Sequence, residues 1–332
     1  MYEVARTTIN ERRALFRNTS QKMNVHEAII EKDFWVCLTL DYLFQRCIYK
    51  SHLVFKGGTC LSKVYNLIQR FSEDIDLILD WRVLGYRMTE PWDVRSKTKQ
   101  EQFNREANER TILFLRDTLL PQITEELSDI IGEKAEFSIN NDDPQTIIFN
   151  YPHIFNAEAI LQGIKLEIGA LAAWNPVSMK TITPYAAEKY SRAFKKPNTE
   201  VLTVEPERTF WEKITILHHE ANRPVSSLMP QRYSRHYYDL YCIAKTEVKD
   251  RAISNIAMLT NVDEFKMRFY PRSWARYQDA KPGTLKLLPP AHNLRLLEED
   301  YENMGEMIFG PRPGFKEMMD AITKLENEIN AS

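Results

Sequence analysis

The chain of 332 residues is long enough for two domains, each with its own hydrophobic core. Its 44 Lys and Arg residues against 46 Asp and Glu give a formal charge of -2, which excludes a globally basic nucleic-acid coat, so any polyanion must be bound by a local patch. The 10 glycines and 16 prolines exclude a collagen-like or broadly disordered chain. Four cysteines without CxxC spacing, an N-terminus without a signal-like apolar run and no long apolar stretch predict a cytoplasmic protein that makes no membrane contact.

The first 200 residues alternate between helical and strand-like hydrophobic patterns. Helical spacing covers 8–47, with Thr8 and Asn24 as candidate caps, then a segment from Thr59 to Ile68 and a longer one over 100–131. Strand-like runs occur at 52–55, 74–79, 136–139, 146–151 and 163–170. These patterns predict a small mixed sheet flanked by helices.

The remainder of the chain is mostly helical after a strand-like run at 200–204. Pro206 begins a helix, as proline in a first helical turn does, and further helical patterns cover 233–245, 294–308 and 315–329. We therefore expect an α+β protein with an α/β domain over 1–200 and a mainly helical domain over 201–332.

Asp74 and Asp76 form a DxD triplet inside a strand-like run. Residues i and i+2 of a strand share a face, so the two carboxylates project together while Ile75 and Leu77 point into a core. Neighbouring carboxylates repel each other unless a proton or a cation intervenes, and Mg²⁺ favours carboxylate and phosphate oxygens. The alternative is an acidic strand end that simply faces water.

Two glycines precede this strand at the end of another. Gly57 and Gly58 let backbone N–H groups approach an anion closely, and Thr59 can cap the helix that follows. The run from Gly57 to Lys63 lacks the GK[ST] ending of a P-loop, which disfavours that fold. A glycine turn followed by a DxD strand places a phosphate site beside a metal site, the combination that a nucleoside triphosphate needs.

A third carboxylate is expected from a different strand. Ile164 to Gly169 alternates, so that Lys165 and Glu167 share one face. A neighbouring strand could bring Glu167 to the Asp74–Asp76 metal while Lys165 offsets phosphate charge. The alternative is an exposed Lys/Glu face.

Two weaker signals lie in the second half. His218-His219-Glu220 does not have the spacing of a zinc motif, and we interpret it as structural or substrate-lining. Residues 265–286 interleave aromatic side chains with basic ones, which suggests RNA binding through Lys266, Arg268, Arg272 and Arg276. A solvated helix anchored by core aromatics is the competing interpretation.

Four motifs in order carry a family resemblance. They are Gly57-Gly58-Thr59 with Arg70-Phe-Ser-Glu-Asp-Ile-Asp76, Lys165-Leu-Glu167, Pro206-Glu207-Arg-Thr-Phe-Trp-Glu212-Lys213 and Arg235-His-Tyr-Tyr-Asp239-Leu-Tyr241. Together with Glu31–Trp35 and Asp300–Met304, they resemble the AbiEii-type toxin nucleotidyltransferases of bacterial toxin–antitoxin and abortive-infection systems, a branch of the DNA polymerase β-like superfamily. The helix between the glycines and the DxD strand is longer than in most polymerase-β-like enzymes.

The resemblance implies a polymerase-β-like nucleotidyltransferase domain and a helical domain that contributes to the active-site cleft. It implies NMP transfer from an NTP to an RNA acceptor, most plausibly the tRNA 3′ end, with growth inhibition as the outcome and a partner antitoxin, often of winged-helix type. Asp74, Asp76 and Glu167 would hold Mg²⁺, with Mn²⁺ as an alternative.

The expected nucleotide site combines these motifs with further basic residues. Gly57–Thr59, Lys63, Lys165 and Lys213 would position the triphosphate. Arg70 and Ser72 are candidates for a phosphate contact, although Arg70 could equally pair with Glu73. Asp239 would orient Lys213 or the acceptor hydroxyl.

Two other functions are compatible with the sequence. One is a nucleotidyltransferase that acts on a small molecule or a protein hydroxyl, and the basic patch at 265–286 argues mildly against it. The other is a nucleotide-binding module without turnover, which the presence of both aspartates, Glu167 and Lys213 disfavours.

Overall fold

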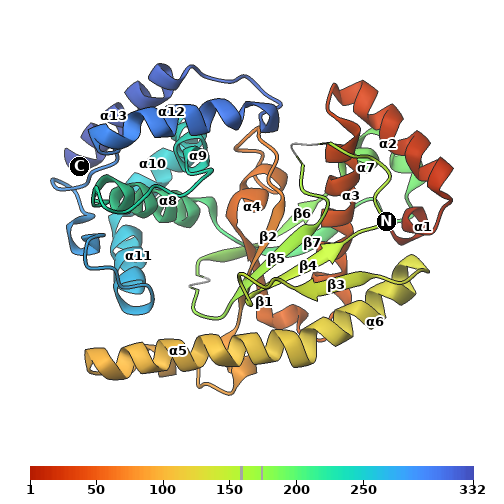
Figure 1. Ribbon diagram of the computed structural model, residues 1–332, viewed down its shortest axis with the longest axis horizontal. Coiled ribbons are helices and arrows are strands. Elements are labelled where there is room, and N and C mark those ends of the chain that lie inside the picture. The colour runs from red at the N-terminus through yellow and green to blue at the C-terminus, as the bar shows by residue number, and fades with distance from the viewer. Residues whose placement is uncertain (158–159, 173–174) are drawn as a thin grey trace. The chain divides into compact units, whose positions relative to one another are not determined.

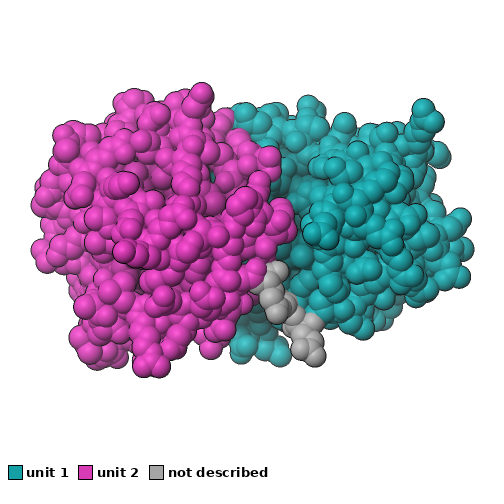
Figure 2. Space-filling view, turned by 90° about the horizontal axis from the view of Figure 1, so that it is seen from above, with its two compact units in different colours: residues 1–64, 71–204 teal, residues 65–70, 205–332 magenta. Residues whose placement is uncertain are grey.

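A computed structural model describes residues 1–157, 160–172 and 175–332. The chain divides into two compact units, one formed by residues 1–64 and 71–204 and the other by residues 65–70 and 205–332 (Figure 2). The short segment 65–70, which the sequence analysis placed in the first domain, therefore belongs to the second unit.

A seven-stranded mixed sheet forms the centre of the first unit, in the order β3-β4-β5-β2-β1-β7-β6 (Figure 1). The strands are β1 (Leu53–Lys56), β2 (Asp74–Leu79), β3 (Glu136–Ile139), β4 (Thr146–Asn150), β5 (Ile164–Gly169), β6 (Val177–Ile182) and β7 (Thr199–Val204). Strand β2 pairs antiparallel with β1 and parallel with β5. The DxD strand thus lies in the middle of the sheet, bordered by the strand that leads into the glycine turn and by the strand that carries Glu167.

Seven helices accompany this sheet in the described part of the first unit. They are α1 (Tyr2–Ala5), α2 (Ile9–Met23), α3 (Glu27–Asp41), α4 (Gly57–Lys63), α5 (Lys97–Phe114), α6 (Leu120–Ile131) and α7 (Tyr185–Lys189). Helix α3 packs on β7, α4 packs on β1 and β2, and α6 packs on β3. A capping box at Thr8 begins α2, and Asn24 ends it in the left-handed conformation, so both predicted caps are helix boundaries.

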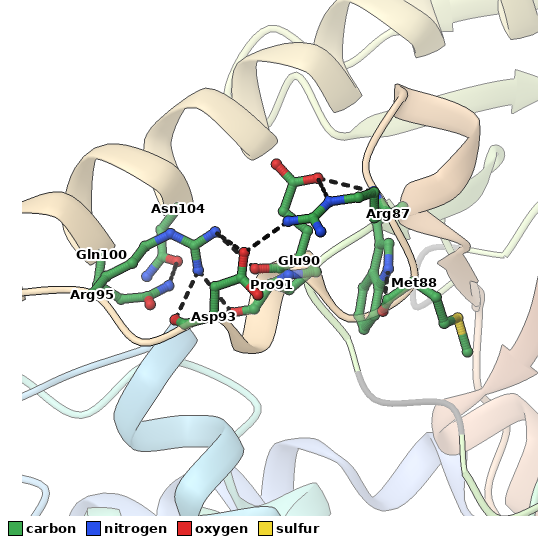
Figure 3. A network of polar contacts seen from close by, with 9 residues as sticks. Arg87, Met88, Glu90, Pro91, Asp93, Arg95, Gln100 and Asn104 are labelled. Atoms are coloured by element: carbon green, nitrogen blue, oxygen red, sulfur yellow. Dashed lines mark hydrogen bonds and ion pairs between the residues drawn. The ribbon is translucent and has the colours of Figure 1, made fainter.

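A polar network orders the loop that joins β2 to α5 (Figure 3). Arg95 donates to the backbone oxygens of Glu90 (2.7 Å) and Asp93 (3.1 Å), and Arg87 donates to the Asp93 carboxylate (3.1 Å). The guanidinium of Arg95 also lies 4.1 Å from the ring centre of Phe103 in α5. This loop is therefore fastened to the helix that follows it.

The second unit is built from helices. They are α8 (Pro206–Ala221), α9 (Ser234–Ala244), α10 (Glu247–Ile253), α11 (Ile256–Phe269), α12 (Leu294–Asn303) and α13 (Phe315–Asn330). Helices α10 and α11 pack on α8, whereas α12 and α13 pack on α9. The segment 65–70 joins them through a bridge between Arg70 and Ile308 and a hydrogen bond from the Phe309 N–H to the Gln69 carbonyl (3.0 Å).

The predicted α+β class is confirmed, and most predicted elements are present. Helix α4 differs from its prediction, because it begins at Gly57 instead of Thr59 and ends at Lys63, well before Ile68. Strand β6 and helix α7 were not predicted at all. No described helix combines the length and the apolar character that crossing a membrane requires.

Candidate active site

The acidic face of β2 is the core of the candidate site. Asp74 and Asp76 are half-buried, while Ile75 and Leu77 between and after them are 0% and 1% exposed on the opposite face. Farther along the acidic face, Ile78 packs into a small cluster with Val54, Ala172 and Val204. The strand therefore presents two carboxylates at its start and a hydrophobic anchor behind them.

The neighbouring strands bring further charged residues to this face. Glu167 of β5 lies directly beside Asp76, and Lys165 lies beside Asp74. Lys56 of β1 lies opposite Asp76 on the other side. Since cross-strand partners share a face, Asp76 has a basic neighbour on one strand and an acidic neighbour on the other. The adjacency of Glu167 to the DxD strand is the arrangement that the sequence suggested.

The glycine turn lies against the second aspartate. Gly57 has a φ of +82°, and a Cβ added there would stand 1.8 Å from Oδ2 of Asp76. Only glycine combines this backbone conformation with so close an approach. Two residues later, the buried hydroxyl of Thr59 donates to the backbone carbonyl of Asp74. The turn and the DxD strand are thus joined at both aspartates.

The donor set fits Mg²⁺ in kind. That ion is usually held by one or two carboxylates and completed by water and substrate phosphates. Asp74 and Asp76 supply such a pair, with Glu167 in the adjacent register. Among the residues that the structure describes, no group of three or more His, Cys, Asp or Glu side chains is arranged as a metal site by itself. A site of this kind depends on substrate oxygens.

Lys63 has a different environment from the one expected of a triphosphate ligand. Its ammonium lies 2.7 Å from Asp33 of α3, and its side chain is 4% exposed. Burial disfavours the charged form, but the Asp33 carboxylate outweighs this effect and raises the pKa of Lys63. The structure therefore gives Lys63 a buried partner instead of an open position. Ser72, another predicted phosphate contact, is half-buried in the loop before β2.

The second unit holds a buried cluster of Arg70, Lys213 and Asp239. Arg70 donates to both carboxylate oxygens of Asp239, at 2.6 and 2.7 Å, and Lys213 lies 2.7 Å from Oδ2 of the same carboxylate. Asp239 is 0% exposed and Arg70 is 4% exposed. Within this unit, Arg70 and Lys213 share the carboxylate of Asp239.

Electrostatics within this cluster is dominated by its two cations. Burial by itself raises the pKa of Asp239, but Arg70 and Lys213 outweigh it and hold that pKa far below the usual aspartate value. Burial lowers the pKa of the Lys213 ammonium, and the charge of Arg70 adds to this effect while Asp239 opposes it. Asp239 thus pairs with two cations inside this unit.

The histidines of α8 have structural partners. His218 accepts from the Lys286 N–H through Nδ1 (3.1 Å), and its Nε2 lies 3.0 Å from the Arg276 carbonyl. His219 packs its ring 4.3 Å from that of Trp274, and burial lowers the pKa of His219 to about 3. Both rings therefore belong to the packing of this unit, as the structural interpretation expects.

The basic patch at 265–286 is only partly available to a ligand. Phe265, Phe269 and Tyr277 are 5–6% exposed and act as core anchors, whereas Tyr270 is 49% exposed. The remaining aromatic residue, Trp274, is partly buried.

The four basic residues of this patch have different environments. Lys266 approaches the backbone oxygen of Glu212 (3.3 Å), Arg276 forms an ion pair with Asp279 (2.7 Å), and Arg272 is exposed near Trp274. Arg268, at the end of α11, is half-buried. Arg272 and Tyr270 remain the best candidates for a nucleic-acid contact.

Two residues near the site were missed by sequence reasoning. Lys56 immediately precedes Gly57, and its position opposite Asp76 follows once β1 and β2 are recognised as antiparallel neighbours. Asp33 lies in the Glu31–Trp35 segment, which was cited only as part of the family resemblance. Its partner Lys63 lies 30 residues further along the chain. The first could have been found from the register, but no local signal indicates the second.

Comparison with known proteins identifies a protein family and a similar solved structure. The model of the family described as nucleotidyl transferase AbiEii toxin, type IV toxin–antitoxin system, matches residues 40–321. The nucleotidyltransferase toxin MenT4 of Mycobacterium tuberculosis H37Rv is similar in structure, with 14% identity and a TM-score of 0.47 over 93% of this chain and 98% of that one. No curated protein matches the chain. The family match covers most of the sequence and all four motifs, and the chain therefore belongs to the AbiEii family of nucleotidyltransferase toxins.

Proposed function

We propose that this toxin is a Mg²⁺-dependent enzyme that moves an NMP from an NTP to an RNA acceptor, with the 3′ end of tRNA as the favoured acceptor. The observation that carries the proposal is the contact between the Gly57 turn and the carboxylate of Asp76, beside Asp74 and Glu167. In this proposal, a glycine at the turn lets its backbone N–H groups and the carboxylate that would bind the metal reach the same phosphate.

Asp74 and Asp76, with Glu167 beside them, are the residues that would hold Mg²⁺ or Mn²⁺. When bound there, the ion would neutralise triphosphate charge and the charge that develops as pyrophosphate leaves. Gly57 and Gly58 let phosphate oxygens approach the backbone, and Lys165 in the register of Asp74 offsets their charge. Thr59 keeps the turn on the strand through the carbonyl of Asp74 and is in this proposal a tether instead of a ligand.

In the second unit, we propose that Lys213 is required for transfer and that Asp239 orients it. The Asp239 carboxylate holds the lysine at 2.7 Å, so the ammonium has a fixed position within its unit. Asp239 also pairs with Arg70, so both of its oxygens already have cationic partners. An orienting role for Asp239 is therefore better supported than direct contact with the acceptor hydroxyl.

An RNA acceptor is proposed from the exposed part of the basic patch, where Arg272 and the half-exposed Tyr270 offer a charge and a stacking surface. Membership of a type IV toxin–antitoxin family implies a cognate antitoxin. A winged-helix antitoxin is the form that we propose. A small molecule or a protein is the second candidate acceptor. The transfer assay described next distinguishes these acceptors from tRNA.

The decisive experiment incubates the protein with each α-labelled NTP and total tRNA, with Mg²⁺ or with EDTA. We expect the wild-type chain to label the tRNA 3′ end in Mg²⁺ but not in EDTA. The Asp76→Ala variant should label no tRNA in either condition. Glu136→Ala, which removes an exposed carboxylate from the edge strand β3, should retain wild-type transfer. Full transfer by Asp76→Ala would show that the proposed site is wrong. Label found only on protein or on small molecules would show that tRNA is not the acceptor.

A further inference from the structure

Three consecutive charged residues of α3 are buried outside the proposed site. Glu31 and Lys32 are 0% exposed and Asp33 is 5% exposed. A buried charge destabilises a fold unless other groups compensate it, so each of these residues needs specific partners. Glu31 finds them in the backbone N–H groups of Ile154 (2.9 Å) and Phe155 (3.0 Å).

Lys32 connects α3 to the start of the DxD strand. Its ammonium donates to the Leu161 carbonyl (2.9 Å) and lies 3.8 Å from the carboxylate of Glu73. Glu73 directly precedes Asp74 and is 3% exposed. The lysine therefore compensates a buried acidic residue at the position where β2 begins.

Asp33 connects α3 to the end of α4. Its carboxylate lies 2.7 Å from the Lys63 ammonium and accepts from the Tyr185 N–H, also at 2.7 Å. The same ammonium lies 3.6 Å from the ring centre of Tyr185. Lys63 is thus enclosed by a carboxylate and an aromatic ring, and it is the last residue of α4.

Helix α4 needs such anchors because it has only seven residues. Isolated helices below about 12 residues are not stable in water, so tertiary contacts must hold α4. Its first turn is tied to Asp74 through Thr59, and its end is tied to α3 through Lys63. We propose that Lys63 and Asp33 form a positioning pair that holds α4 so that the Gly57 turn stays against Asp76. This inference rests on the proposed function of the Gly57–Asp76 contact.

The proposal opposes the role of Lys63 as a direct triphosphate ligand. A direct ligand stabilises the bound nucleotide, so its loss raises the KM for NTP. A positioning pair acts on the geometry of the reacting groups, so its loss lowers kcat and leaves the KM nearly unchanged. Two residues that act as one unit also give non-additive effects when both are changed.

The test compares Asp33→Asn, Lys63→Met and the double variant, using NMP transfer with the NTP and acceptor that the wild-type chain accepts. We expect each single change to lower kcat by about tenfold or more while the KM for NTP stays within about threefold. The double variant should be no slower than the slower single variant, and Lys63→Arg should restore part of kcat. Asp41→Asn is the matched control, because Asp41 is a buried carboxylate of the same helix with its own lysine partner, Lys196, at 3.0 Å. It should leave kcat unchanged.

Amide hydrogen exchange of residues 57–63 gives a readout that does not need activity. We expect faster exchange there in Asp33→Asn than in the wild type, and no change in Asp41→Asn. If the wild-type chain transferred no nucleotide, the proposed function would fail while this measurement still tested the anchor. Unchanged exchange in Asp33→Asn, or a raised KM in Lys63→Met with normal kinetics in Asp33→Asn, would overturn the positioning pair.

A further variant covers the case in which a single change prevents folding. Asp33→Leu with Lys63→Met removes both buried charges together, a replacement that folds commonly tolerate. It should fold with a KM for NTP within about threefold of the wild type. A folded double variant that has lost NTP affinity would show that Lys63 binds phosphate directly.

Discussion

Replacing Gly57 by alanine tests the geometry on which the proposed site depends. The new Cβ would stand 1.8 Å from Oδ2, 2.5 Å from Cγ and 2.9 Å from Cβ of Asp76, so the turn or the aspartate must move. The φ of +82° adds a conformational cost of about 1–2 kcal/mol for alanine. Overpacking a tight contact costs about 1–3 kcal/mol. We therefore expect a loss of roughly 2–5 kcal/mol in the free energy of unfolding, a large part of the stability of a typical domain.

Activity should respond more strongly than stability. The overlapping atom belongs to the carboxylate that is proposed to bind the metal, and a misplacement of about 1 Å in a catalytic group can lower a rate about 100-fold. We expect Gly57→Ala to reduce NMP transfer to tRNA by at least about that factor. Urea unfolding followed by tryptophan fluorescence and transfer of an α-labelled NTP measure the two effects.

Gly85→Ala is the matched control in the same unit. Gly85 has a φ of +86°, but a Cβ there would meet only the end of the Arg110 side chain, at 4.0 Å. This variant should lose only the conformational term of about 1–2 kcal/mol and keep wild-type transfer. If both variants lost equal stability and both stayed active, the close approach of Gly57 to Asp76 would not matter and the reasoning would be refuted.

The further predictions concern two residues of the second unit, Asp239 and Arg272. Asp239→Asn leaves Arg70 and Lys213 without their shared carboxylate, so urea unfolding should show a loss of about 3–5 kcal/mol, and a loss below about 1 kcal/mol would contradict the buried pairing. The pKa of Asp239 is lower in the folded state than in the unfolded state. Its contribution to stability is therefore complete above the ordinary pKa of about 3.9 and is lost as the pH falls toward the folded-state pKa. The acid-induced loss of stability should accordingly be smaller in Asp239→Asn than in the wild type. Arg272→Ala should weaken tRNA binding and reduce the slope of log affinity against log salt by about 1. Arg295→Ala, which removes an exposed arginine paired with Glu299, should change neither the affinity nor the slope. Equal slopes in the two variants would show that Arg272 does not contact RNA.

The sequence was sufficient for the parts of the fold that depend on local periodicity. Alternation at 74–79 and 164–169 predicts β2 and β5, and it also predicts which side chains share a face. The parallel pairing of these strands then places Glu167 beside Asp76. Strand β6 escaped prediction because Met179 and its neighbours alternate weakly on an exposed edge of the sheet, where residue 179 is 53% exposed.

The parts that could not be predicted depend on contacts between distant segments. No pattern in the sequence indicated that the hydroxyl of Thr59 donates to the carbonyl of Asp74, 15 positions away. The sequence suggested phosphate or the near neighbour Glu73 as a partner for Arg70, but gave no sign of the carboxylate of Asp239, 169 positions away. Local sequence offers several polar partners of equal merit, and only packing decides among them. The motif residues were therefore found, while several of their partners were not.

Lys63 and Lys213 show why partner identity matters for function. Both are lysines at buried positions in motif helices, and sequence reasoning gave both the same role. Lys63 shares its environment with one carboxylate, so the pair is neutral and exerts little field on an anion. Lys213 shares its carboxylate with Arg70, and the two cations together hold the pKa of Asp239 low. Since Lys63 has a carboxylate of its own whereas Lys213 shares one with a second cation, Lys213 is the better candidate for the proposed attraction of a triphosphate and Lys63 for the role of holding α4.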